Sequence, residues 1–119
     1  MAWLARLGRR AAAKLRIRAG GQIAVTFIDA GAMRALNRKW TGHRGLTDVL
    51  SFRYDHEPIV GDILVSPEAA RRYADAHGLP YRRELARYMV HGLLHWLGHE
   101  DRTAAEQRRM RAMEDRLLG

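Results

Sequence analysis

The amino-acid sequence predicts an α+β fold, in which about five helices pack with a small mixed β-sheet. Three observations support this prediction. Several segments carry apolar residues at helical spacing, whereas three shorter segments are rich in β-branched and aromatic residues. These segments follow one another as helix, strand, helix, strand, strand and three helices, an order typical of α+β proteins. A length of 119 residues fits one core, so we expect residues 1–119 to form a single domain.

The first eighteen residues predict an amphipathic helix. Their apolar side chains recur at helical spacing, at Trp3, Leu4, Leu7, Ala11 and Leu15. The stretch is rich in arginine and free of acidic residues, a composition that also fits an organellar transit peptide. We prefer the helix, and no apolar run approaches the roughly 20 residues needed to cross a membrane. We therefore expect a cytoplasmic protein without membrane contact.

A strand and a helix follow the glycine pair at residues 20–21. Residues 22–29 alternate apolar and polar side chains, which predicts a strand. Asp29 can cap the next helix, which the spacing of apolar residues places at about residues 30–40. The buried side of this helix is expected to carry Met33, Leu36 and Trp40.

Two further strands are expected to form a hairpin. β-branched and aromatic residues predict strands at residues 47–54 and 59–66, and the segment DHEP between them is typical of a turn. Because this connection is so short, antiparallel pairing is the simplest arrangement.

Two helices follow the hairpin. Ser66 offers a capping hydroxyl and Pro67 suits the first helical position, so a helix should begin here and end at Gly78. Pro80 opens the next helix, whose apolar stripe is formed by Leu85, Met89, Leu93 and Trp96. Its polar stripe is formed by Glu84, Arg87, His91 and His95. The first two of these residues either support the histidines from behind or belong to an ordinary solvated helix face.

The last helix begins with Thr103 and Glu106, which have the spacing of a capping box. Its apolar side is formed by Met110, Met113 and Leu117, and its exposed side by Arg108, Arg109, Arg111 and Arg116. The whole chain has a net charge of +8, carried almost entirely by arginine. Because the planar guanidinium suits phosphate groups, nucleic acid is the expected partner, and a solvated basic surface is the alternative.

The segment HGLLHWLGHED, residues 91–101, has the spacing of a metal site. His91 and His95 are four residues apart, so a helix places both imidazoles on one face. Gly98 can end the helix in a left-handed conformation and let Asp101 return as a third ligand. Two imidazoles and one carboxylate leave a zinc ion with an open position, as in catalytic sites. The chain has no cysteine, so thiolate ligands are excluded.

Other interpretations of this segment exist. An uninterrupted helix would place His99 on the same face as the two histidines, which makes it the alternative third ligand. The histidines could also be surface or capping residues without a metal, although the glycine and the following acid disfavour this. Metzincin peptidases share the spacing, but Gly92 stands where they have their catalytic glutamate, so a peptidase would lack its general base.

Three separated segments resemble the YbeY family of bacterial endoribonucleases, namely LNRKWTGHRGLTDVLSF, GDILVSPEAA and HGLLHWLGHED. The resemblance covers about residue 22 to the C-terminus. It implies a hydrolase with one Zn²⁺ ion that cleaves single-stranded RNA, and a sheet with a fourth, short strand. It also implies 3′-end maturation of 16S ribosomal RNA and ribosome assembly and quality control, with ribosomal RNA and the small ribosomal subunit as partners. The family's metal ligands fall on His91, His95 and Asp101.

The chain departs from the family's pattern at two places. Most members have a third histidine at the position of Asp101, whose carboxylate can bind zinc but lowers the net charge of the site. The family's usual loop arginine falls on Thr41, and Arg44 can replace it, with His43 beside it. Asp48 stands where the family has Asp or Asn.

A mechanism follows from these residues. A metal at this site would polarise a phosphate oxygen or activate water, and we predict Arg44 and Arg87 as catalytic residues that stabilise charge on the phosphoryl group. The 2′-hydroxyl of RNA is an alternative nucleophile. Two other functions remain open: a zincin-type metallopeptidase, and a non-catalytic ribosome-assembly factor whose structural metal site is closed by His99.

Overall fold

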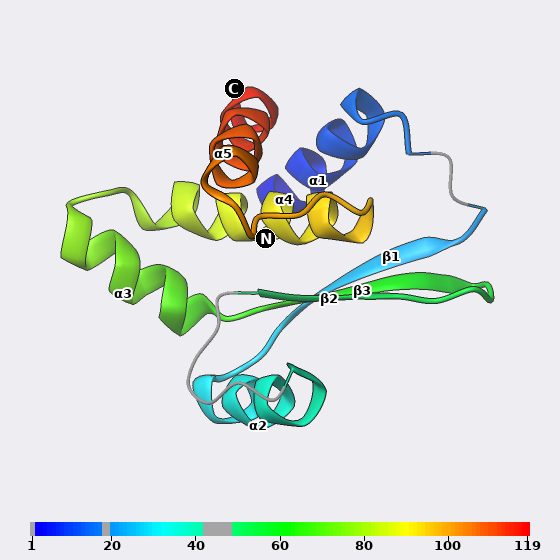
Figure 1. Cartoon of the computed structure of the whole chain (residues 1–119), viewed down its shortest axis with the longest axis horizontal. Coiled ribbons are helices and arrows are strands. Elements are labelled where there is room, and N and C mark those ends of the chain that lie inside the picture. Colours follow the sequence, from blue (N-terminus) through cyan, green and yellow to red (C-terminus); the bar gives the residue numbers. More distant parts are fainter. Residues whose placement is uncertain (1, 18–19, 42–48) are drawn as a thin grey trace.

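The computed structural model describes residues 2–17, 20–41 and 49–119. Over these residues the helices and strands follow one another in the predicted order (Figure 1). They are α1 (Ala2–Lys14), β1 (Gln22–Phe27), α2 (Ala30–Thr41), β2 (Val49–Arg53), β3 (Ile59–Val65), α3 (Pro67–His77), α4 (Tyr81–Trp96) and α5 (Ala104–Leu118). The predicted α+β fold class is therefore confirmed.

The strands within the described ranges form one mixed sheet in the order β1-β3-β2. The central strand β3 runs parallel to β1, where Val25 pairs with Ile63, and antiparallel to β2, where Leu50 pairs with Leu64. The expected hairpin of β2 and β3 is thus confirmed. The fourth strand that the family resemblance implied does not occur among the described residues. Residues 47 and 48 of the predicted second strand lie outside them.

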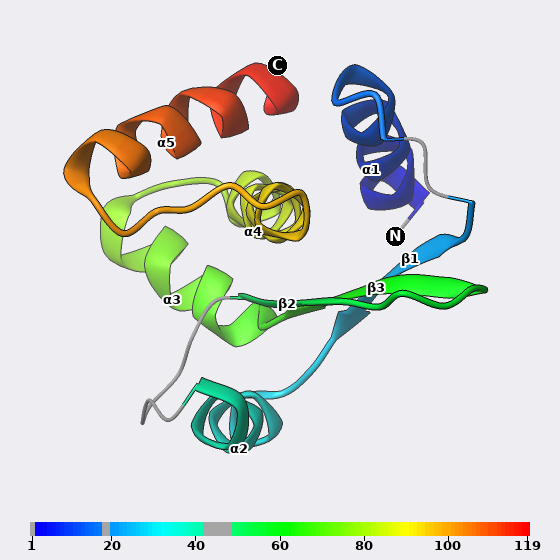
Figure 2. The same ribbon diagram turned by 45° about the vertical axis from the view of Figure 1, so that its right-hand side comes forward.

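Helix α4 is the central element of the core. It lies on one face of the sheet with α1, α3 and α5 packed against it, whereas α2 covers the opposite face (Figures 1 and 2). Ile63 and Val65 of β3 are fully buried in one cluster with Val90 and Leu94 of α4. Burial of each such side chain contributes roughly 1.5–3 kcal/mol. The helix that carries the predicted metal ligands is therefore held rigidly by the core.

Helix α1 is amphipathic, as predicted. Leu4, Leu7 and Ala11 are buried in the cluster around α4. The helix is shorter than expected, because it ends at Lys14 and the chain takes a positive φ of 56° at Arg16. In the described part of the chain, no helix combines the length and the apolar character needed to span a membrane.

The prediction that Trp40 belongs to the buried side of α2 is wrong. Its residue surface is 60% exposed, whereas Met33 and Asn37 are buried and Leu36 is half-buried. Trp40 lies in the last turn of α2, where its ring makes an edge-on contact with Phe52 at a centroid distance of 5.6 Å and Lys39 Nζ lies 5.4 Å from the ring centroid. Among the helices that the structure describes, α2 alone covers this face of the sheet, whereas α1, α3 and α5 pack around α4 on the other face.

The predicted helix caps are present. Asp29 accepts a hydrogen bond from the backbone N–H of Ala32 at 2.8 Å, and Ser66 Oγ accepts one at the start of α3. Gly78 ends α3 in a left-handed conformation with φ 63°. Thr103 and Glu106 form the complete capping box at the start of α5. Caps of this kind contribute about 1 kcal/mol each, and the last one fixes the segment that precedes α5.

Candidate metal centre

The end of α4 has the geometry that the metal interpretation requires. The helix ends at Trp96, and Gly98 takes φ +104°, a conformation that favours glycine. The backbone N–H of Gly98 donates to the carbonyl of His95 at 2.9 Å, which closes the last turn. The chain then returns toward the helix, and Gln107 Nε2 donates to the Asp101 carbonyl oxygen at 3.1 Å. The predicted break at Gly98 is confirmed, and it brings Asp101 back to α4.

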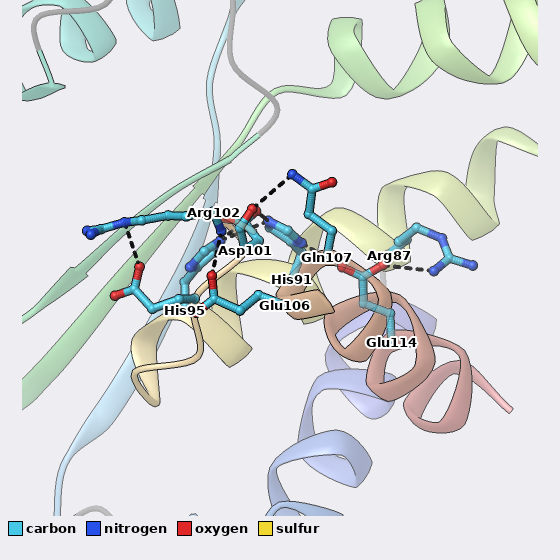
Figure 3. Close-up of polar contacts among 9 residues, drawn as sticks. Arg87, His91, His95, Asp101, Arg102, Glu106, Gln107 and Glu114 are labelled. Carbon is cyan, nitrogen blue, oxygen red and sulfur yellow. Dashed lines mark hydrogen bonds and ion pairs between the residues drawn. The ribbon is translucent and has the colours of Figure 1, made fainter. Parts of the chain in front are cut away.

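Three donor atoms converge at this point (Figure 3). The Nε2 atoms of His91 and His95 are 3.0 Å apart, and Asp101 Oδ2 lies 3.3 Å from the first and 3.4 Å from the second. Metal–ligand distances of about 2.0–2.1 Å in a tetrahedral site give ligand atoms about 3.3 Å apart. The spacing of the three atoms therefore matches one face of such a tetrahedron. The group could hold a metal ion, and no fourth ligand joins it from the part of the chain that the structure describes.

The converging group contains Asp101 and does not contain His99. His99 is exposed and follows Gly98, where the chain has already left the helix. An uninterrupted helix would have kept it on the face of the other two histidines, but the left-handed glycine prevents this. Of the two third ligands that the sequence allows, the geometry therefore favours Asp101.

Behind His91 lies a buried carboxylate that sequence reasoning missed. Glu114 of α5 is 4% exposed, and its Oε2 atom accepts from His91 Nδ1 at 2.5 Å. Its Oε1 atom accepts from Arg87 Nη1 at 2.8 Å, and Arg87 Nη2 donates to Asp115 Oδ1 at 2.6 Å. The sequence does contain a signal, because Glu114 lies on the helical stripe between the buried Met110 and Leu117.

Arg87 is held as a cation within this cluster. Burial opposes its charge, but hydrogen bonds to Asp115 and Glu114 outweigh burial, so the pKa of Arg87 is raised. The bond to Arg87 in turn lowers the pKa of Asp115. Glu84 is also buried, with Oε1 lying 3.7 Å from Arg87 Nε. The alternative of a solvated helix face is therefore wrong for both Glu84 and Arg87.

Gly92 lies where α4 packs closely against the sheet. A Cβ atom at this position would lie 2.5 Å from Ile63 Cγ2 and 2.8 Å from Val49 Cγ2. The position next to His91 thus faces the sheet and has no room for a glutamate side chain. The missing general base of a metallopeptidase is therefore a consequence of how this helix packs.

A cleft of about 460 Å³ opens beside the site. It is lined by residues of α3, α4 and α5 together with Asp101, among them Tyr73, His91 and Arg111. A substrate in this cleft would have access to two of the converging donors and to a basic side chain on α5.

The predicted catalytic arginines have different positions. Arg87 lies behind His91, separated from it by Glu114 (Figure 3). Arg44, with His43 and Asp48, lies outside the described residues. Thr41 is the last residue of α2.

Comparison with known proteins identifies a match over the whole chain. Residues 1–119 match the family model described as endoribonuclease YbeY. The endoribonuclease YbeY of Geobacillus kaustophilus is 37% identical over 126 residues, which cover 95% of this chain and 81% of the relative. That of Persephonella marina is 37% identical over 104 residues, covering 82% of this chain and 68% of the relative.

Some relatives are much longer than this chain. The endoribonuclease YbeY of Myxococcus xanthus is 38% identical over 107 residues, which cover 84% of this chain but 36% of the relative. Among solved structures, the solution structure of a protein from Thermotoga maritima aligns with a TM-score of 0.66 and 23% identity. The alignment covers 97% of this chain and 78% of that protein, so the two share a fold.

Proposed function

The chain belongs to the YbeY endoribonuclease family, and on this premise we propose that it is a zinc-dependent endoribonuclease of single-stranded RNA. The observation that supports this most is the convergence of His91, His95 and Asp101, which leaves a fourth position open as far as the described residues go. We further propose that the enzyme acts in the cytoplasm on the 3′ end of 16S ribosomal RNA, with the small ribosomal subunit as its partner.

The proposed chemistry needs few protein groups. A zinc ion bound here would act as a Lewis acid toward a phosphate oxygen and lower the pKa of a water molecule. The two neutral imidazoles and the Asp101 carboxylate are the donor types that zinc accepts. Gly92 leaves the position next to His91 without a general base, so the 2′-hydroxyl of RNA is a suitable nucleophile. This feature favours RNA over DNA as the substrate.

Arginine side chains have two proposed roles. Arg44 remains our candidate for stabilising the charge on the phosphoryl group. Arg87 has both terminal nitrogens hydrogen-bonded to carboxylates, so we now propose that it acts through Glu114 and not on substrate. Exposed arginines of α5, including Arg111 at the cleft, would hold the RNA backbone. Binding should therefore weaken steeply as salt concentration rises.

Cleavage of a single-stranded RNA that carries the small-subunit 3′ end tests this proposal. We expect the purified protein to cut it, and either a chelator or His91→Ala to reduce the rate by more than about 100-fold, because loss of a ligand exceeds the effect of losing a supporting residue. Arg34→Ala, at an exposed position of α2 on the opposite face of the sheet, is the matched control and should retain the metal-dependent cleavage. The endoribonuclease assignment is wrong if wild type and His91→Ala cut equally. It is also wrong if the wild type cuts neither the free RNA nor ribosome-bound RNA.

The two alternative functions are less well supported. The packing of Gly92 against Ile63 and Val49 leaves a metallopeptidase without its base. A structural metal site needs a fourth protein ligand, and His99 is exposed and absent from the converging group. Cleavage of protein but not RNA would favour the first alternative, and ribosome binding that survives the loss of His91 and His95 would favour the second.

A further inference from the structure

Glu114 is a buried charged residue whose two oxygen atoms have different partners. Oε1 accepts from Arg87 at 2.8 Å, and Oε2 accepts from His91 Nδ1 at 2.5 Å. A carboxylate removed from water is costly unless it is paired. Here both oxygens are satisfied, one by a cation and the other by an imidazole that faces the metal site with its second nitrogen. The carboxylate thus links a buried ion pair to a predicted metal ligand.

The contact determines which nitrogen of His91 carries the proton. An ionised carboxylate can only accept hydrogen bonds, so the hydrogen must lie on Nδ1. The lone pair of a neutral imidazole then lies on Nε2, which is the atom directed toward His95 Nε2 at 3.0 Å and Asp101 Oδ2 at 3.3 Å. Histidine ligands of metals depend on such a partner for their tautomer and their ring orientation.

Glu114 is itself held from a second direction. Arg87 lies one helical turn before His91 on α4, and its guanidinium contacts both Glu114 and Asp115 of α5. The carboxylate therefore cannot rotate away from His91 without losing its ion pair. Met110 and Leu117 bury the same stripe of α5 through apolar contacts, so the packing of the two helices does not depend on this carboxylate alone.

We infer that Glu114 is a positioning residue for the metal centre, which fixes the Nδ1–H tautomer and the ring orientation of His91, and that Arg87 holds Glu114 in place. This inference rests on metal binding at the site of the proposed function and is independent of whether RNA is cut. It assigns a role to two buried charged residues that the packing of an apolar core would not require.

The affinity of the purified metal-free protein for Zn²⁺, measured by competition with a chromophoric chelator, tests the inference. Removal of a supporting carboxylate typically weakens metal binding by about 10–100-fold, and we expect this loss for Glu114→Ala. Glu114→Gln keeps the shape of the side chain but not its charge, so it should lose less zinc affinity than Glu114→Ala. Asp115→Asn is the matched control, because Asp115 also contacts Arg87 but its side chain is 53% exposed and it does not reach His91. Its affinity should change by less than about 3-fold.

A spectroscopic measurement separates positioning from a merely structural role. The ¹⁵N chemical shifts of the His91 imidazole should show hydrogen on Nδ1 in the wild type and a mixture of tautomers in the folded Glu114→Gln and Glu114→Ala proteins. If the tautomer is unchanged, or if Asp115→Asn weakens zinc binding as much as Glu114→Ala does, the inference is wrong. If Glu114→Ala does not fold, Glu114→Gln decides in the same two measurements. Failure of RNA cleavage with normal zinc affinities would contradict only the proposed function.

Discussion

The apolar and the polar stripe of α4 differ in how far their side chains are shielded from water. Leu85 and Leu94 of the apolar side are almost completely buried against the rest of the core. Along the polar stripe, the exposed fraction of the side chain rises from 4% at Glu84 to 20% at His91 and 29% at His95. The polar stripe therefore changes along its length from buried ion pairs to open metal donors.

This difference shows how one helix can both stabilise the core and present side chains for metal binding. Hydrophobic burial is non-directional, so the apolar stripe is stabilised by any well-packed neighbour. Hydrogen bonds and metal coordination are directional, so the polar stripe needs particular partners from elsewhere in the chain. Glu114 of α5 and Asp101 of the preceding loop provide them. Changes to the first stripe should therefore affect stability, and changes to the second should affect metal binding and catalysis.

The largest effect on stability along the apolar side is expected at Gly92. Gly92→Ala places a methyl group 2.5 Å from Ile63 Cγ2, and relief of this overlap requires α4 to move from the sheet. Overpacking of this kind costs about 1–3 kcal/mol. Urea unfolding of the variant should show a lower midpoint with an unchanged slope.

Gly8→Ala is the matched control for this prediction. Gly8 is also within a helix, but a Cβ atom there would meet the flexible side chain of Met89, with Sδ at 3.4 Å and Cε at 3.5 Å, which are ordinary contacts. Because alanine favours helix over glycine, this variant should be more stable than the wild type by up to about 1 kcal/mol. Equal effects of the two substitutions would contradict the close approach of α4 and the sheet at Gly92.

The smallest expected effect is the contribution of Asp115, an exposed partner of Arg87, to the pH dependence of stability. The hydrogen bond from Arg87 lowers the pKa of Asp115 from its ordinary value of 3.8. A group with a lowered pKa in the folded state stabilises the protein above its unfolded pKa, and this stabilisation disappears as the pH falls through the folded value. Because the Asp115 side chain is 53% exposed, solvent screening limits the contribution to about 0.5 kcal/mol or less.

The contribution of the Asp115 charge to the free energy of unfolding is measured by comparing Asp115→Asn with the wild type. At pH 7 the variant should be slightly less stable in urea unfolding, and at pH values well below 3.8 the difference should vanish. A difference that grows toward acid pH would show that Arg87 does not stabilise the charged form of Asp115.

Sequence patterns predicted those features that depend on neighbouring residues. Helical spacing gave both stripes of α4, and glycine and capping residues located the break at Gly98 and the start of α5 at Thr103. These depend on backbone preferences within a few residues. The order of the elements and the hairpin followed from the same local signals.

Features that depend on tertiary packing escaped prediction. Trp40 has the right spacing for a buried residue, but it is 60% exposed at the last turn of α2. Glu114 was missed because its partners, Arg87 and His91, lie on another helix. The reason for glycine at position 92 also becomes visible only when the side chain of Ile63 is in place. Local sequence patterns indicate which face of a helix a residue occupies, but not which residues of other helices or strands pack against that face.

The central claim is that His91, His95 and Asp101 hold one metal ion that is required for RNA cleavage. The most direct measurement is a titration of the metal-free protein with Zn²⁺, in which bound metal and RNA cleavage are followed together. We predict that cleavage rises in proportion to bound zinc up to one equivalent, and that Asp101→Ala weakens both while His99→Ala weakens neither. Full zinc affinity in Asp101→Ala with loss in His99→Ala, or cleavage that is independent of bound zinc, would contradict the account.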